Sequence, residues 1–194
     1  MSTEMHREFP EIIETERLLL RSPRAGDGAE LNAAIRESFE QLHAWMEWAD
    51  HMPTVEESEE NCRTAYEKFL ARTDFPLQAR LKSSGELVLR MGLHPLDWKV
   101  PSFEIGYWRR KGFDGQGYVT EAVRAVTRLA FETLGANRVQ ICCDSRNIRS
   151  RNVAERAGYR LEAELRNAEI ALQGGLRNTL IFALIPADYA ALCK

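Results

Sequence analysis

The sequence has no long apolar run and no excess of basic charge. No window approaches the roughly 20 apolar residues that a membrane-spanning helix needs. The 26 Lys and Arg residues against 29 Asp and Glu residues give a net charge of -3, whereas proteins that bind nucleic-acid backbones usually carry a basic excess. We therefore expect a soluble, cytoplasmic protein with neither a membrane span nor a nucleic-acid partner.

Cysteines are few, and none has the spacing of a metal ligand. The four are Cys62, Cys142, Cys143 and Cys193; they form no C-x-x-C pair, and no Cys or His neighbours them at the spacing of a zinc site. We expect free thiols and no bound metal. Adjacent residues of a strand point to opposite faces, so at least one of Cys142 and Cys143 should be a small core residue.

The chain also lacks a linker. No stretch rich in Pro, Gly and Ser, or in charge of one sign, divides its 194 residues, and this length is sufficient for one substantial core. We predict a single domain over residues 1–194, in which residues 1–14 form a flexible N-terminal arm.

Hydrophobic periodicity predicts both helices and strands. Apolar residues spaced by three and four predict helical segments at residues 29–48, 54–72, 118–134 and 150–157. The first should break near Ser38, and Thr54 with Glu57 forms a capping box. Short apolar stretches predict strands at residues 15–22, 75–82, 86–93, 103–108, 138–143, 159–171 and 176–185. The second to fourth should form an antiparallel meander, and Gly174-Gly175 a hairpin turn.

The segment Gly115-Gln116-Gly117 lies between a predicted strand and the strongest predicted helix. Backbone amides at a helix N-terminus bind anions, and glycine permits positive φ and a close approach of phosphate. The pattern alone also fits an ordinary strand-to-helix turn. A dinucleotide-binding motif is disfavoured because Thr120 replaces its third glycine, and no Gly-Lys-Ser/Thr follows as in a P-loop.

A larger pattern surrounds these glycines. It comprises Glu104-Ile-Gly-Tyr-Trp108, then Gly115-Gln-Gly-Tyr-Val-Thr-Glu-Ala122, Asn137-Arg-Val139, Asn147-Ile-Arg-Ser150 and residues 153–162, preceded by Thr15-Glu-Arg-Leu-Leu-Leu-Arg21. Together these segments resemble the GNAT acetyltransferases over residues 15–185. Leu42-His-Ala-Trp45-Met-Glu-Trp48 is similar to an element of the branch that contains the ribosomal-protein N-terminal acetyltransferases RimL and RimJ.

The resemblance implies an α/β fold of the α+β type, a single GNAT domain. Its mixed central sheet would be flanked by helices and splayed between the fourth and fifth strands. The pantetheine arm of acetyl-CoA would lie in the splay, and the amides of residues 113–118 would hold the pyrophosphate. The cofactor-binding residues implied are Ile105, Tyr107, Trp108, Phe113, Gly115, Gln116, Gly117, Tyr118, Thr120, Asn147 and Asn152.

Three residues depart from the family's pattern. Gly112 occupies the first position of Gln/Arg-x-x-Gly-x-Gly/Ala, which affects one cofactor contact but not the amide cradle. Leu89 stands where this branch often has glycine, which would reshape the acceptor side. Ala163 replaces the glycine of Leu-Glu-Gly.

The activity implied is direct attack of a primary amine on the acetyl thioester. Ser150 is the candidate donor to the departing thiolate because it follows Asn147 at the spacing of the RimL-like branch, although a serine there also fits a helix N-cap. Glu169 is the candidate base, at the position of a glutamate in RimL-like enzymes; a solvated strand residue is the alternative. Tyr107 is a further donor, or a packing residue.

The motifs do not fix which amine accepts the acetyl group. An α-amine with a pKa of ~8 loses its proton more easily near neutral pH than a lysine at ~10.4, which suits a site without a catalytic histidine in its motifs. The first hypothesis is therefore a protein N-terminus, the second a small amine such as a polyamine, amino sugar or antibiotic, and the third a CoA-binding module without turnover. His94 is expected at the surface or in a turn, and family resemblance also suggests a homodimer.

The acceptor cleft should lie near residues 45–48. We expect one of Trp45 and Trp48 to pack in the core, because they share a helical face, and the other to face a cationic substrate together with Glu47. The acidic clusters Glu56-Glu57 and Glu59-Glu60 fit a solvated helix face, with attraction of an amine as the alternative.

Overall fold

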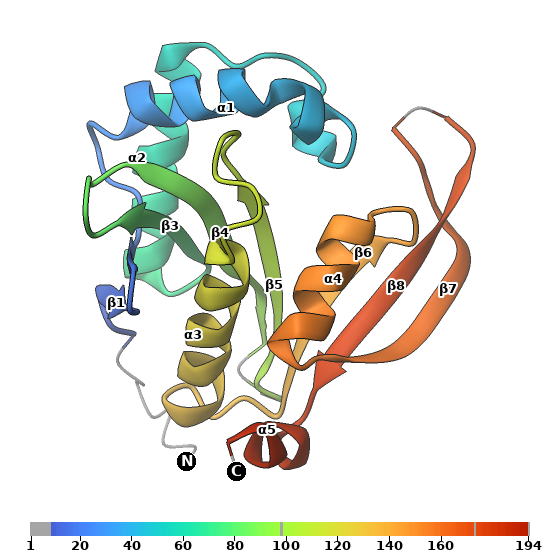
Figure 1. Ribbon diagram of the computed structural model, residues 1–194. Helices are drawn as coiled ribbons and strands as arrows, with labels where there is room; N and C mark the ends of the chain where they lie inside the picture. The colour runs from blue at the N-terminus through green and yellow to red at the C-terminus, as the bar shows by residue number, and fades with distance from the viewer. Residues whose placement is uncertain (1–8, 98, 173, 194) are drawn as a thin grey trace.

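A mixed sheet runs through the protein (Figure 1). The computed structural model describes residues 9–97, 99–172 and 174–193. The strands are β1 (Ile12–Glu14), β2 (Leu18–Arg21), β3 (Phe75–Leu81), β4 (Leu87–Asp97), β5 (Ser102–Arg109), β6 (Arg138–Asp144), β7 (Arg160–Ile170) and β8 (Leu176–Leu184). Their order across the sheet is β1-β2-β3-β4-β5-β6-β8-β7. Neighbouring strands are antiparallel except β5 and β6, which are parallel.

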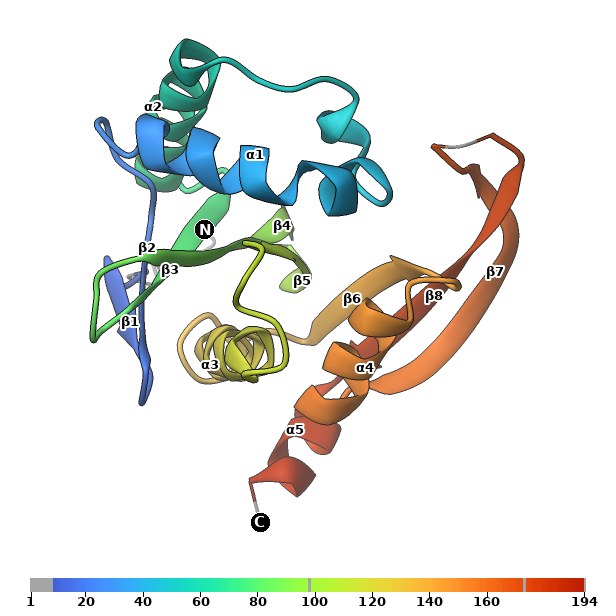
Figure 2. The ribbon, with the colours of Figure 1, turned by 45° about the horizontal axis from the view of Figure 1, so that its top comes forward.

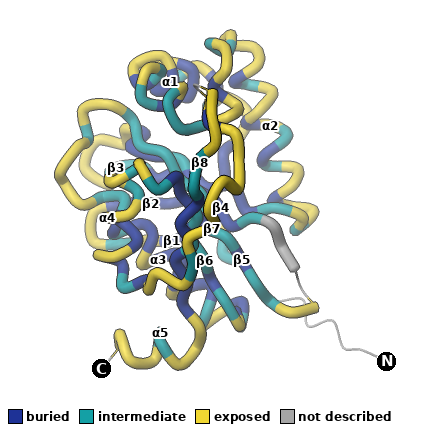
Figure 3. Tube along the Cα trace, turned by 90° about the vertical axis from the view of Figure 1, so that its right-hand side faces the viewer, coloured by how far each residue is buried: buried dark blue, intermediate teal, exposed yellow. Residues whose placement is uncertain are grey.

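Helices cover both faces of this sheet. They are α1 (Gly28–His43), the short 3-10 helix η1 (Glu47–Ala49), α2 (Val55–Ala71), α3 (Tyr118–Glu132), α4 (Ile148–Ala157) and α5 (Pro186–Leu192). Figure 2 shows α1 and α2 on one side of the sheet and α3 on the other, with α4 next to α3. The outer strand β7 is exposed along nearly all of its length (Figure 3).

The sheet opens between β5 and β6. The pairing of β4 with β5 continues to the end of β5, where Leu89 faces Arg109. In contrast, β5 pairs with β6 only from Ser102–Arg138 to Glu104–Gln140. The two strands then diverge, so that residues 105–109 form an edge that β6 does not cover. The predicted splay is confirmed; it lies between the fifth and sixth strands because β1 was not predicted.

The flexible arm expected over residues 1–14 does not extend to residue 14. Residues 12–14 form β1 and pair with β2, from Ile12 opposite Arg21 to Glu14 opposite Leu19. The side chain of Ile13 is buried in the main core. A strand of three residues is too short to produce a periodic signal. Residues 1–8 of the expected arm lie outside the described residues.

Helix α1 runs unbroken through Ser38, so the break predicted there is wrong. The Ser38 hydroxyl donates to the Ala34 carbonyl at 2.7 Å and accepts the Lys111 amide at 2.9 Å. This back-bonding satisfies the buried serine without ending the helix. The chain instead leaves the helix after His43, and it is extended at Met46 before η1.

Other local predictions are confirmed. The Thr54 hydroxyl accepts the Glu57 amide and the Glu57 carboxylate accepts the Thr54 amide, as a capping box requires. Strands β3, β4 and β5 form the meander. Gly174 and Gly175 have φ of +84° and +81° in the turn that joins β7 and β8. Helix α5 was not predicted. No helix within the described ranges is long and apolar enough to cross a membrane.

A charge network on Asp27 fixes the start of α1 against the sheet. Its carboxylate accepts hydrogen bonds from Arg21 at 2.7 and 2.8 Å, from Gln78 at 2.6 Å and from Arg80 at 3.2 Å. Burial opposes the charged form of Asp27, but the hydrogen bonds from Arg21 and from the Arg24 amide outweigh it and lower the pKa of this carboxyl below its usual value.

We expect Asp27→Asn to lower the free energy of unfolding at pH 7 by on the order of 3 kcal/mol, because the partly buried Arg21 loses its counter-charge and Arg80 keeps only Glu30. The folded-state pKa of Asp27 is depressed, so its contribution is present above the unfolded pKa and is lost as the pH falls through the folded one. Urea denaturation should therefore show the two proteins converging below about pH 4. Asp50→Asn, at an exposed carboxylate, is the control; a pH-independent difference would contradict this account.

Candidate active site

The loop between β5 and α3 contains three glycines with positive φ. Gly112, Gly115 and Gly117 have φ of +92°, +71° and +80°, in the left-handed region that favours glycine. Helix α3 starts at Tyr118, and its N-cap residue Gly117 supplies no side-chain cap. Residues 115–117 are exposed. The first amides of α3 are thus open to an anion, as the sequence predicts.

Arg17, which precedes β2, holds this loop. Its guanidinium donates to the Gln116 carbonyl at 2.9 Å and to the Glu121 carboxylate at 2.7 Å, and it lies 4.5 Å from the centre of the Tyr118 ring. Glu121 also accepts the Thr15 hydroxyl at 2.6 Å and the Arg17 amide at 2.9 Å. Burial opposes the charge of Glu121, but these hydrogen bonds lower its pKa, so it stays ionised.

Sequence reasoning missed this support for the loop. Thr15-Glu-Arg17 and Thr120-Glu121 both belong to segments that resemble the family, but no local signal joins residues about 100 positions apart. Thr120 itself is buried in the first turn of α3.

Helix α4 begins on the opposite side of the splay, and its N-cap is Asn147. The Asn147 side chain accepts the Ser150 amide at 3.1 Å. Ser150 is therefore not the cap, and its hydroxyl lies 2.9 Å from the hydroxyl of Tyr107, which belongs to β5. Two predicted residues thus meet across the splay. Asn152, also predicted, is exposed on α4.

The Tyr107 hydroxyl stays protonated at neutral pH. Burial raises the pKa of Tyr107 well above its usual range, and the hydrogen bond with Ser150 offsets only part of this shift. Tyr107 and Ser150 together therefore present two neutral hydroxyl groups between β5 and α4.

Several predicted cofactor residues have their side chains in the protein interior. Ile105 is buried in the main core, and Phe113 and Tyr118 pack against it with their rings 6.3 Å apart. Trp108 packs against a second core beneath α1, with its ring 6.1 Å from that of Trp48. Ile105 and Trp108 therefore lie at the splay through their backbone atoms, on the edge that β6 leaves uncovered.

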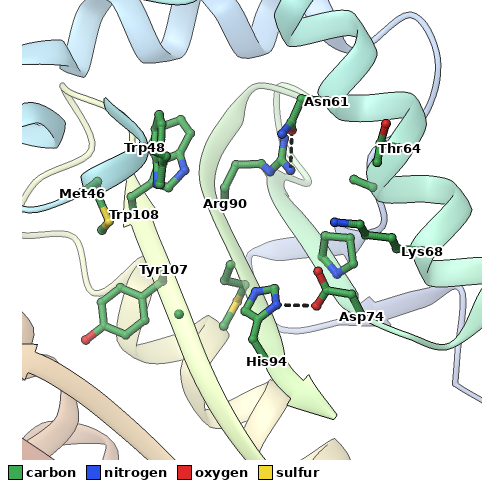
Figure 4. A pocket seen from close by; sticks show the side chains of 14 residues that line it. Met46, Trp48, Asn61, Thr64, Lys68, Asp74, Arg90, His94, Tyr107 and Trp108 are labelled. Carbon is green, nitrogen blue, oxygen red and sulfur yellow. Dashed lines mark hydrogen bonds and ion pairs between the residues drawn. The ribbon is translucent and has the colours of Figure 1, made fainter. Parts of the chain in front are cut away.

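A cavity of about 320 Å³, the β4–β5 cavity, lies between α2 and strands β4 and β5. Its lining includes Tyr107, Trp108 and Trp48, and Figure 4 shows these side chains around it. Because Tyr107 also contacts Ser150, the cavity adjoins the splay. Neither Trp45 nor Trp48 is a buried core residue, contrary to expectation, since α1 ends before both of them.

His94, which we expected at the surface or in a turn, lies on a strand, keeps a partly exposed side chain and lines this cavity. It lies on β4, which extends through Asp97, and its Nδ1 is paired with the carboxylate of Asp74 (Figure 4). The ring covers the cross-strand pair Gly92 and Gly106. The signal was missed because His94-Pro95 suggested the end of a strand.

Glu169 lies on β7 opposite Arg177 of β8, and their side chains form an ion pair. Arg177 also approaches Glu47 at 3.9 Å and Asp144 at 4.0 Å. It lines a second cavity of about 290 Å³ together with Trp45, Glu47 and Asp144. The candidate base is therefore held by an arginine, on the hairpin beyond β6.

The cysteines are free thiols, and that of Cys143 hydrogen-bonds to Ser150. Cys143 is buried, while burial, followed by the charge of Glu104, raises the pKa of Cys142 to about 12. In the part of the chain that the structure describes, no group of three or more His, Cys, Asp or Glu side chains could hold a metal ion.

Comparisons with known proteins relate this site to a family. Residues 17–160 match the family described as acetyltransferase (GNAT) domain. YdaF of Bacillus subtilis (strain 168), named as a ribosomal N-acetyltransferase, is 30% identical over 174 residues, which cover 90% of this chain and 94% of YdaF.

Two solved structures share the fold. One is MccE, the microcin C7 self-immunity acetyltransferase, in complex with acetyl-CoA and AMP; its TM-score is 0.84 at 22% identity, covering 92% of this chain and 98% of MccE. The other is RimL, the ribosomal L7/L12 α-N-protein acetyltransferase, in complex with coenzyme A; its TM-score is 0.81 at 20% identity, covering 90% and 98%. The match over residues 17–160, together with the identity to YdaF, shows that this chain belongs to the GNAT acetyltransferase family.

Proposed function

We propose that this protein transfers the acetyl group of acetyl-CoA to the α-amine of a protein N-terminus. The proposal rests on the backbone edge at residues 105–108, which β6 leaves uncovered. The open amides of α3 lie on one side of this edge, and the hydroxyl groups of Tyr107 and Ser150 lie on the other. The acceptor class is supported by YdaF and RimL, whose names are those of ribosomal-protein acetyltransferases.

The chemistry of coenzyme A fits this arrangement. Its pantetheine arm carries two amides, which an uncovered strand edge can pair with, as in the addition of a peptide strand to a sheet. Its pyrophosphate can accept hydrogen bonds from the amides of residues 113–118, and the α3 dipole adds ~0.3–1 kcal/mol per charge. Asn147 uses its side-chain oxygen in the α4 cap, so its NH2 group can still donate to the arm, and the exposed Asn152 side chain offers a second contact.

The reaction joins the acceptor nitrogen to the acetyl carbon and breaks the bond from that carbon to sulfur. The nitrogen loses a proton to a base, and the departing thiolate gains one. We assign the second transfer to Ser150, whose contact with the protonated Tyr107 hydroxyl orients it and supplies a further donor. Holding both substrates in line can lower the barrier by about 7–11 kcal/mol, so alignment is the larger contribution.

Two side chains are candidates to accept the proton from nitrogen. Glu169 is the residue that family resemblance indicates, and its carboxylate is paired with Arg177 on the hairpin beyond β6. His94 lines the cavity beside Tyr107, and Asp74 fixes the orientation of its ring. An α-amine with a pKa of ~8 needs only a weak base, so both stand as candidates.

Profiles of kcat/KM against pH should separate these roles. Replacement of the true base, by Glu169→Gln or His94→Gln, should lower kcat/KM by about 10²-fold or more and remove its acidic limb, because base catalysis is lost. Ser150→Ala should lower kcat while that limb remains. An unaltered profile in both Gln variants would assign the proton to water and remove Glu169 and His94 as bases.

A small amine is the second candidate acceptor. The β4–β5 cavity of about 320 Å³ has the size of a small-molecule pocket, and it is lined by aromatic and polar side chains. A pocket of this size accommodates a small amine as readily as the first residues of a peptide.

Acetyl transfer to a panel of amines tests the proposal. In single-turnover reactions with acetyl-CoA, peptides with a free N-terminus should release CoA thiol at least 10-fold faster than polyamines or amino sugars, because they place an amine of low pKa in the cleft. The control is the same peptide with a blocked N-terminus and a free lysine, which should react poorly. Preference for a small amine would overturn the acceptor class, and CoA binding without turnover would overturn catalysis.

A further inference from the structure

The β4–β5 cavity contains a guanidinium without a carboxylate partner. Arg90, on β4, donates to the Asn61 side chain at 3.2 Å (Figure 4) and hydrogen-bonds to Cys62. Asn61 is neutral, and burial raises the pKa of the Cys62 thiol, so that it is neutral too. Within residues 9–97, 99–172 and 174–193, Arg90 has no ion pair.

A second cation lies on the same cavity. Lys68 is exposed on α2, seven residues after Asn61 and therefore on the same helix face, and it has no ion pair with the described residues either. The acid among the lining residues is Asp74, whose carboxylate is already paired with His94 and accepts the Phe75 amide at 2.9 Å. The cavity therefore carries an excess of positive charge.

We expect the charge of Arg90 in the β4–β5 cavity to have a counter-ion. Burial lowers the pKa of Arg90, but a guanidinium is so strongly basic that it stays charged. Buried charges in proteins are normally paired, because an unpaired one loses its hydration without compensation. Arginine binds carboxylates and phosphates through two parallel hydrogen bonds, so a ligand with such a group would supply the missing partner.

Arg90 is close to the residues that we assign to the reaction. In the β4–β5 ladder it faces Trp108, and the next residue, Met91, faces Tyr107. Facing residues of an antiparallel pair have Cα atoms about 4.5–5.5 Å apart. An extended peptide advances about 3.3–3.6 Å per residue, so its second or third residue can reach Arg90 while its amine lies near Tyr107.

We propose that Arg90 and Lys68 form an anion subsite of the acceptor pocket. The subsite receives the side-chain carboxylate of Asp or Glu at the second or third position of the N-terminus that is acetylated. This inference rests on the proposed function and names the acceptor's sequence class.

The acidic residues of α2 do not oppose this reading. Glu57 is used in the capping box, and Glu59 accepts the Gly26 and Gly28 amides at 2.8 and 2.9 Å. Neither lines the cavity, so the alternative that these clusters attract a cationic amine receives no support from the structure.

Peptides that differ only at position two or three test the subsite. With Glu, Gln or Lys there, wild-type kcat/KM should be about 10-fold higher for Glu than for Gln, mainly through KM, because a charge-assisted hydrogen bond is added. Lys68→Gln should reduce this preference several-fold and Arg90→Gln should abolish it. Arg63→Gln removes an exposed charge from the same helix outside the cavity and should keep the preference.

A charge-reversing variant keeps the test valid if Arg90→Gln does not fold. If thermal denaturation shows that Arg90→Gln is unfolded, Lys68→Glu at the exposed position decides: it should shift the preference toward the Lys peptide. Retained preference for Glu in Lys68→Glu and Lys68→Gln would overturn the subsite.

The outcomes separate this inference from the function on which it rests. Equal use of all three peptides by the wild-type protein would overturn the subsite and leave N-terminal acetylation standing. Acetylation of small amines that carry phosphate or carboxylate, in a manner that depends on Lys68, but of no peptide, would overturn the acceptor class and support the subsite. Acetylation of no amine would overturn both.

Discussion

The pairing of β5 with β6 ends after Glu104 and Gln140, and the site depends on this interruption. Adjacent strands normally continue to pair, because an uncovered row of backbone donors and acceptors costs free energy. Here each strand is held by its other neighbour, β5 by β4 as far as Arg109 and β6 by β8 as far as Asp144. The sheet therefore keeps an edge in its middle without losing either half.

Contacts from distant segments keep this opening in shape. Ser38 of α1 accepts the Lys111 amide just after β5, and Arg17 bonds the Gln116 carbonyl just before α3. The glycine loop is thus held at both ends, while its own amides stay open. Tyr107 contacts Ser150 on α4 and also lines the β4–β5 cavity, so one side chain joins the opening of the sheet to the cavity.

Much of the secondary structure around the site could be predicted from the sequence, because the signals for helices and turns are local. The capping box at Thr54 and Glu57, the hairpin glycines and the stripe of α3 each depend on a few neighbouring residues. The splay came from the resemblance to the family, since periodicity does not report where two strands separate. The contacts of the site could not be predicted, because Arg17 with Glu121 and His94 with Asp74 join different elements.

The acceptor side changed most between sequence and structure. The acidic clusters of α2 fitted a solvated helix face, with attraction of an amine as the alternative, and Glu57 and Glu59 serve the starts of helices. Among the described residues that line the cavity, the charges without an ion pair are Arg90 and Lys68, which periodicity had placed only on a strand and a helix. A charge's sign is visible in sequence, whereas its partner is set by packing.

Amide hydrogen exchange with and without CoA tests the central claim most directly, namely that the cofactor occupies the opening between β5 and β6. We predict that CoA slows exchange at residues 105–108, at residues 113–118 and at the start of α4, and leaves β1 and β2 unchanged. The large cavity lined by Arg124, Arg128 and Arg156 offers the competing location. Protection confined to that surface, with residues 105–108 unaffected, would contradict the account.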